Sequence, residues 1–175
     1  TKVFTGTLFN QGNYQKANVF QFKYALPRVF FVHDAVIISE LNDQLEVLRK
    51  QGFNPLNTAV LEKQIGEITY HPDSEASITY WSPDKIEIQA DVSIDQLLVL
   101  SEIYYPKGWK ITSQPNWIIH PVNSILRGIK IPSGNHHIVM EFAPDDILQG
   151  NIMTWGSTAI LILLLLSGLI KKTKE

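Results

Sequence analysis

An uninterrupted apolar run near the end of the chain constrains the fold more than any other feature. No charged residue occurs between Ile147 and Lys171, and residues 159–166 are apolar at every position. A helix rises about 1.5 Å per residue, so residues 152–170 reach roughly 28 Å, close to the hydrocarbon thickness of a bilayer. A buried core helix is the alternative, but such helices usually keep a polar stripe and are shorter. The run therefore predicts a transmembrane helix over 147–170.

The residues that flank this run predict its orientation. Trp155 suits the headgroup region, and the tail 171–175 carries three lysines. On the other side, no Lys or Arg occurs between Lys130 and the run. Basic residues beside a span favour the cytoplasmic side. We therefore expect a cytoplasmic tail and an extracytoplasmic region 1–150, anchored in the bacterial cell (inner) membrane with the lipid bilayer as its partner.

An external domain needs a route across the membrane. The chain begins at Thr1 and shows no signal-peptide pattern. We therefore expect it to be the C-terminal fragment of a longer protein.

Composition excludes several classes of function. Without the tail, the chain has 12 basic and 16 acidic residues and no basic block, so nucleic acid is not expected as a partner. The absence of cysteine from the sequence excludes disulfides, zinc–thiolate sites and a cysteine nucleophile. We predict no cofactor.

Most of the remaining chain has the pattern of short strands separated by turns. Residues 85–92 alternate polar and apolar, and residues 97–100 are apolar on both faces, which indicates a central strand. Further strands are predicted within 1–23, 28–32, 117–122, 126–131 and 136–142. Strands about every ten residues, with Gly and Pro between them, indicate a mainly β fold. We expect an antiparallel β-sandwich of the jelly-roll or immunoglobulin-like kind.

One short surface helix is predicted near 43–51. Asn42 is its expected N-cap and Gly52 its end, and Leu41, Leu45 and Leu48 share one face. The pattern as a whole divides the chain into an N-terminal α+β subregion 1–62, a linker 63–75, a β-sandwich region 76–146, the transmembrane helix 147–170 and the cytoplasmic tail 171–175.

A search for catalytic motifs finds none in the sequence. It has no glycine-rich phosphate loop, no Gly-x-Ser-x-Gly elbow and no His-Glu-x-x-His pair. His136 and His137 are adjacent on a predicted strand, so their side chains point to opposite faces and cannot share one metal. A carboxylate pair for acid–base catalysis stays open, because spatial proximity is not visible in a sequence. We predict no metal site and assign no catalytic residue.

Aromatic residues crowd into the stretch 80–117. Their faces suit stacking on sugar rings or a membrane interface, and core packing is the plainer alternative. Arg127 and Lys130 suit a lipid phosphate, whereas a solvated strand face is the usual place for such residues. The candidates selected for contact with a glycan or lipid are Tyr104, Tyr105, Trp109, Trp117 and Arg127.

Residues 97–110 (LLVLSEIYYPKGWK) resemble the "LLVLSE-YYPGWK" pattern of YfhO-type bacterial membrane proteins. Residues 132–136 match the family's "P-x-G-x-H" turn, and residues 141–144 match its "E-F-x-P" strand end. A terminal transmembrane helix completes the resemblance, which covers about residues 24–170. Two departures are Lys107, inserted between the proline and glycine, and residues 112–117, which replace the family's Asp-Gly-Lys hairpin.

The resemblance implies a polytopic membrane protein related to GT-C glycosyltransferases, which use polyprenyl-phosphate sugars to modify cell-envelope polymers. In such a protein this chain is the extracytoplasmic C-terminal domain and last span, with an accessory role in positioning donor or acceptor. The catalytic residues of the family belong to an N-terminal multi-span region, so none is assigned here. That region also implies a polyprenyl-phosphate sugar and an envelope polymer as partners.

A second hypothesis is a non-enzymatic envelope module, anchored by one span, that binds a protein partner or glycan. The full gene separates the two. About ten or more further hydrophobic segments upstream favour the first hypothesis, and a single signal sequence favours the second.

Overall fold

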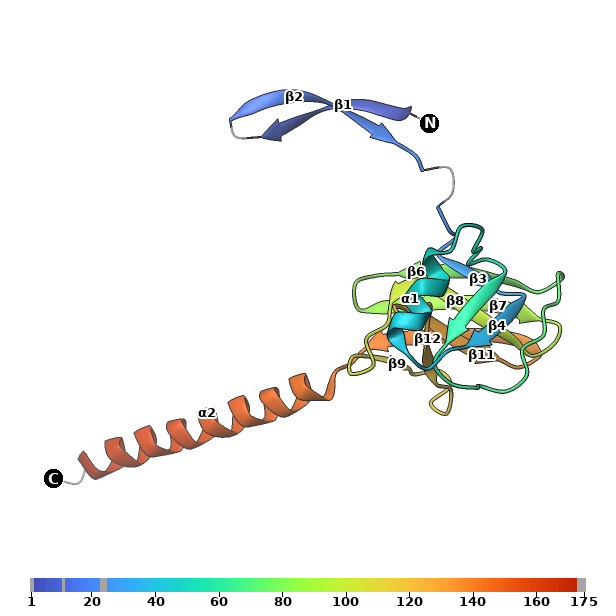
Figure 1. The fold of residues 1–175 in the computed structure, drawn as a ribbon. Coiled ribbons are helices and arrows are strands. Elements are labelled where there is room, and N and C mark those ends of the chain that lie inside the picture. Colours follow the sequence, from blue (N-terminus) through green and yellow to red (C-terminus); the bar gives the residue numbers. More distant parts are fainter. Residues whose placement is uncertain (1, 11, 23–24, 173–175) are drawn as a thin grey trace.

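The structure, a computed structural model, describes residues 2–10, 12–22 and 25–172. Two β-sheets pack face to face, and a hairpin and a long helix project from them (Figure 1). The larger sheet has, in spatial order, β3 (Val29–Phe31), β8 (Gln96–Ile103), β11 (Leu126–Ile131), β10 (Ile119–Val122), β5 (Thr58–Leu61) and β4 (Asp34–Ile37). The smaller has β6 (Glu75–Trp81), β7 (Lys85–Val92), β12 (Gly134–Phe142) and β9 (Trp109–Ile111). The mainly β sandwich expected from the sequence is confirmed.

The space between the two sheets holds the main hydrophobic core. In β7 the alternating residues Ile86, Ile88, Ala90 and Val92 are buried, as the period-two pattern predicts. They face Leu98, Leu100, Ile129 and Ile131 on β8 and β11 of the other sheet, and Ile138 and Met140 lie beside them on β12.

The outer face of the larger sheet is also covered. In β8, Leu97 and Val99 belong to a second buried cluster with Val32, Leu61 and Val122. The prediction of a central strand over 97–100 is confirmed, because β8 lies between β3 and β11 and is buried on both faces.

The larger sheet departs from a purely antiparallel arrangement at one place. Strands β4 and β5 pair in parallel. A parallel pair needs a crossover rather than a tight hairpin, and the helix α1 (Leu41–Arg49) lies in that crossover.

The predicted surface helix is present, but its cap and its buried face differ from the prediction. The N-cap is Glu40 rather than Asn42, and Leu41 is 57% exposed. The side chain of Gln44 is buried instead, where its Nε2 donates to the carbonyl of Ile38 at 2.7 Å. Its Oε1 accepts from Ser124 Oγ at 2.8 Å. A buried amide that is hydrogen-bonded on both sides therefore fixes the helix to the sheet.

The two regions predicted on either side of residues 63–75 share one sheet. Strand β3 pairs with β8, and β5 pairs with β10. Residues 63–75 lead from β5 in the larger sheet to β6 in the smaller one.

Residues 2–10 and 13–20 form a hairpin that stands apart from the other described strands, which agrees with the strands predicted in 1–23. Strands β1 (Lys2–Asn10) and β2 (Asn13–Phe20) pair with each other and, among the described residues, with no other strand. The hairpin extends away from the sandwich (Figure 1). Several large apolar side chains are more than half exposed on it, namely Val3, Phe4, Phe9, Tyr14, Val19 and Phe20.

The last described element is the long helix α2 (Asp145–Lys172). Its segment Asp145–Leu164 is long and apolar enough to cross a membrane, and the described side chains there are exposed. Only residues 143 and 144 separate this helix from the end of β12. The N–H of Ala143 donates to the carbonyl of Gly108 at 2.7 Å, which ties this joint to the sandwich.

Candidate functional site: an aromatic pocket at the base of the C-terminal helix

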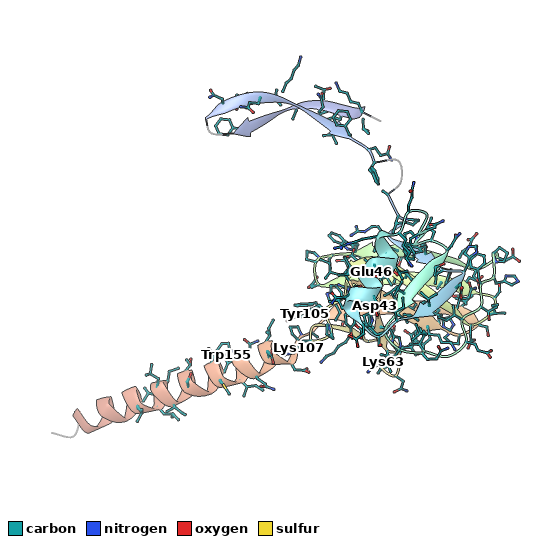
Figure 2. All side chains as sticks on the ribbon, viewed as in Figure 1. Asp43, Glu46, Lys63, Tyr105, Lys107 and Trp155 are labelled. Carbon is teal, nitrogen blue, oxygen red and sulfur yellow. The ribbon has the colours of Figure 1, made fainter. Side chains whose placement is uncertain are left out.

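A pocket of about 600 Å³ is formed around β9 and its flanking loops. All five candidate contact residues from the sequence line it: Tyr104, Tyr105, Trp109, Trp117 and Arg127. The end of the sandwich that carries this pocket is the end next to α2. Figure 2 shows Tyr105 and Lys107 there, with Trp155 further along the helix.

The pocket wall is built where β8 turns into β9. The N–H of Tyr104 donates to the carbonyl of Ile125 at 2.7 Å, and the N–H of Gly108 donates to the carbonyl of Tyr105 at 3.2 Å. A Cβ at Gly108 would lie 2.2 Å from the ring of Phe142 and 2.7 Å from that of Tyr105. Only glycine therefore allows the turn to approach the end of β12 this closely.

The two pocket tryptophans have a core side and an open side. Trp109 and Trp117 are half-buried and pack on the inter-sheet core. The ring of Trp109 is 5.7 Å from that of Phe142, and Trp117 meets His136 edge-on at 5.1 Å. The same residues thus pack on the core and contribute to the pocket lining.

Arg127, on β11, is the most buried charged residue of the pocket, with 4% of its surface exposed. Its Nε donates to the carbonyl of Ile103 at 2.8 Å, and its guanidinium lies 4.1 Å from the ring centre of Trp109. Its Nη1 is buried and has no hydrogen-bond partner among the described residues. Burial lowers the pKa of the guanidinium, and the charge of Glu102 opposes this. Arginine nevertheless stays protonated in proteins, so the pocket contains a buried positive charge.

Glu102 is itself engaged by another cation. The Nη2 of Arg28 donates to Glu102 Oε1 at 2.6 Å. Glu102 therefore acts on Arg127 through its field, while its hydrogen-bonded ion pair is with Arg28.

A second cation of the pocket was missed by the sequence analysis. Lys110 lines the pocket and pairs with Asp145, the first residue of α2, at 2.6 Å. Its place in the "YYPGWK" match was the signal that could have identified it. Lys130, considered with Arg127 for a phosphate, is absent from the pocket lining and lies 4.0 Å from Asp95. Tyr80 and Trp81, on β6, are also outside the lining.

A smaller pocket of about 290 Å³ adjoins the first and shares Tyr104, Ile118 and Ile119 with it. Its lining is more polar and includes Glu62, Lys63, His120 and Ser124. Burial lowers the pKa of His120. Burial also raises the pKa of Tyr104, with a further contribution from Glu62. Near neutral pH both side chains are therefore uncharged.

The adjacent histidines of β12 face opposite sides, as the strand alternation predicts. His136 is half-buried beside Trp117, whereas His137 is exposed and its Nε2 lies 3.2 Å from Glu87 Oε2. The same carboxylate lies 2.7 Å from Lys85 Nζ. In the described ranges, no three His, Asp or Glu side chains are grouped to hold a metal ion.

No family model, curated protein or solved structure matches this chain. The pocket itself combines aromatic faces with a buried guanidinium. Such groups bind a ligand that has an apolar or sugar face and a negative charge.

Proposed function

We propose that this chain is the extracytoplasmic C-terminal domain and final membrane span of a polytopic membrane protein that resembles the YfhO-type glycosyltransferases. In this proposal the aromatic pocket helps to position a polyprenyl-phosphate sugar or the envelope polymer that accepts it. The transfer chemistry belongs to the multi-span region of the parent protein. The basic tail 171–175 favours the cytoplasmic side for the far end of the helix.

The observation that carries the proposal is the closeness of the pocket to the base of α2. Two residues join β12 to the helix, and the Lys110–Asp145 ion pair of 2.6 Å links the pocket lining to the first helical residue. If the apolar segment enters a bilayer, the headgroup region lies next to the pocket. A ligand with a lipid tail in the membrane and a head group in the pocket fits this arrangement.

The chemistry of the lining supports the same class of ligand. Tryptophan and tyrosine faces stack on sugar rings, and the rings of Tyr105, Trp109 and Trp117 contribute to one pocket. A volume of about 600 Å³ is in the range of small-molecule sites and accommodates a sugar unit with its linkage.

The test measures binding of farnesyl phosphoryl glucose to the full chain 1–175 by titration calorimetry. Lauryldimethylamine-oxide micelles are the medium, because this detergent has neither a sugar nor a phosphate. We expect Trp117→Ala to weaken binding about tenfold, because losing one stacking partner is equivalent to roughly 1–1.5 kcal/mol.

Trp81→Ala is the matched control. It removes a tryptophan that is 47% exposed on β6, outside the pocket lining, so its affinity should equal that of the wild type. Equal affinity of wild type, Trp81→Ala and Trp117→Ala, or no binding at all, would contradict the proposal.

The isolated hairpin favours a second candidate function, a non-enzymatic envelope module anchored by one span. Its exposed Phe4, Phe9 and Phe20 are large apolar side chains that no other described strand covers, which suits a protein partner. Complementation of a deletion strain separates the two functions. If the hairpin serves a protein partner, removing residues 2–20 abolishes complementation but leaves binding of farnesyl phosphoryl glucose intact. Trp117→Ala then weakens binding of farnesyl phosphoryl glucose but leaves complementation intact.

A further inference from the structure

The position of Arg127 in the pocket is unusual for a structural arginine. It is 4% exposed, yet its Nη1 has no hydrogen-bond partner in the described part of the chain. A buried donor without a partner destabilises the fold, and a buried charge does so more strongly. A buried arginine with a purely structural role would be expected to form an ion pair with a neighbouring carboxylate.

The nearest candidate for such pairing is used elsewhere. Glu102 accepts from Arg28 at 2.6 Å, and Arg28 also lies over Trp81, 4.7 Å from the ring centre. One carboxylate thus serves two guanidinium groups. The local balance around Arg127 is therefore positive.

The lining as a whole is also positive. Arg127 and Lys110 are its cations, and no Asp or Glu occurs among the described residues that line it. By contrast, residues 24–150 contain nine basic and 16 acidic residues, so this part of the chain is acidic. A cationic pocket in an acidic domain selects for an anion by charge alone.

The geometry defines how that anion approaches. The indole of Trp109 covers one face of the guanidinium at 4.1 Å. Nε is engaged with the carbonyl of Ile103. An unused donor of Arg127 is therefore Nη1, whose N–H groups lie in the guanidinium plane. Because Nη1 is buried, a ligand oxygen bonds to it only after the side chains around it move aside. In-plane approach is the geometry in which arginine binds phosphate and carboxylate oxygens.

We infer that Arg127 is the anion-binding residue of this pocket and that its ligand places a phosphoryl group on Nη1. The inference rests on the proposed function for its choice of phosphate over other anions. The aromatic rings hold the neighbouring sugar or apolar part of the same molecule. The phosphoryl group can come from a lipid-linked ligand or from a soluble phosphate.

The test titrates the full chain in lauryldimethylamine-oxide micelles with four probes: farnesyl phosphate, farnesol, glucose 1-phosphate and inorganic phosphate. Farnesyl phosphate and farnesol differ only in the charged group. We expect the wild type to bind farnesyl phosphate at least tenfold more tightly than farnesol. Tighter binding of farnesyl phosphate than of the soluble phosphates assigns the site to a lipid-linked ligand, and the reverse assigns it to a soluble one; both support an anion site.

The variants are Arg127→Met, which keeps an apolar stem without charge, and Arg127→Lys, which keeps charge without the planar fork. Arg127→Met should abolish the preference for phosphate over alcohol, and Arg127→Lys should keep part of it. Lys130→Met removes a cation from the same strand outside the pocket and should leave the preference unchanged. If Arg127→Met fails to fold, Arg127→Lys decides the question: a weaker phosphate preference in this variant, with the full preference retained in Lys130→Met, supports the inference, and an unchanged preference overturns it.

Equal affinity of the wild type for farnesol and farnesyl phosphate would overturn the inference, even if both bind. A phosphate preference that survives in folded Arg127→Met would also overturn it. A different result would contradict the proposed function: equal binding of farnesyl phosphoryl glucose by the wild type and Trp117→Ala. A phosphate preference that depends on Arg127 while Trp117 is dispensable supports the anion site alone.

Discussion

Replacing Trp109 with alanine tests whether the pocket wall is also a structural support of the sandwich. Complete burial of a large aromatic corresponds to a loss of about 3–5 kcal/mol on truncation to alanine. Trp109 is half-buried, so its core contribution is about 2 kcal/mol on that scale. The guanidinium of Arg127, 4.1 Å from the ring, loses its aromatic partner as well, which adds about 1 kcal/mol. We therefore expect a loss of about 3 kcal/mol in the free energy of unfolding.

Urea unfolding of the full chain in micelles, followed by circular dichroism of the β-sandwich, measures this loss. Trp155→Ala is the control, because Trp155 lies on α2 and is 74% exposed. Trp109→Phe keeps a ring against Phe142 and Arg127 and should lose clearly less than the alanine variant. If Trp109→Ala unfolds at the same urea concentration as Trp155→Ala, the argument that the indole supports the sandwich is wrong.

Three further predictions concern the joint, the short helix and pH. Gly108→Ala should lower stability by about 1–3 kcal/mol through overpacking, whereas Gly156→Ala, with open space around it, should not; urea unfolding compares them. Gln44→Ala should lower the free energy of unfolding by about 1–3 kcal/mol, because the buried hydrogen-bond partners of Gln44 are left unsatisfied. Asn42→Ala should change it by less than about 0.5 kcal/mol, because Asn42 is not the N-cap of the helix. A larger loss at Asn42 would show that Asn42 caps the helix after all. Hydrogen bonds from Lys85 and His137 lower the pKa of Glu87 in the folded protein. The carboxylate therefore stabilises the fold fully above about pH 4.3, the ordinary glutamate pKa, and this stabilisation is lost as the pH falls through the lower folded pKa. Glu87→Gln should flatten the fall of the melting temperature at acid pH, and an unchanged pH profile would refute this prediction.

Local patterns in the sequence predicted both the position of individual strands and which of their faces are buried. The alternation of Lys85–Val92 identifies both the strand and its core face, because one face of β7 meets the opposite sheet. The run 97–100 similarly identifies a strand buried on both faces. These are properties of single segments, so no knowledge of their partners is needed.

Features that depend on distant partners were not predictable in this way. The amide of Gln44 is buried because Ser124, 80 positions away, supplies a hydrogen bond to it. Asn123, with φ of 50°, accepts from the N–H of Val60 at 2.8 Å and joins two strands. Neither role has a period or a motif in the sequence.

The candidate site shows the same division. Its aromatic residues were selected from the sequence because they are concentrated in one stretch of it. The burial of Arg127 follows from the pairing of β11 with β8, and that pairing is long-range. Lys110 becomes part of the site through Asp145, 35 positions later.

The joint between the sandwich and α2 limits how far the sandwich can move from the start of the helix. Two residues span at most about 7 Å, and Ala143 is already bonded to Gly108. In a bilayer that α2 crosses, the sandwich would stay next to the surface, and a lipid-tailed ligand would reach the pocket by lateral diffusion in two dimensions. Its effective concentration is then set by its fraction among the lipids, so even a weak intrinsic affinity suffices for occupancy.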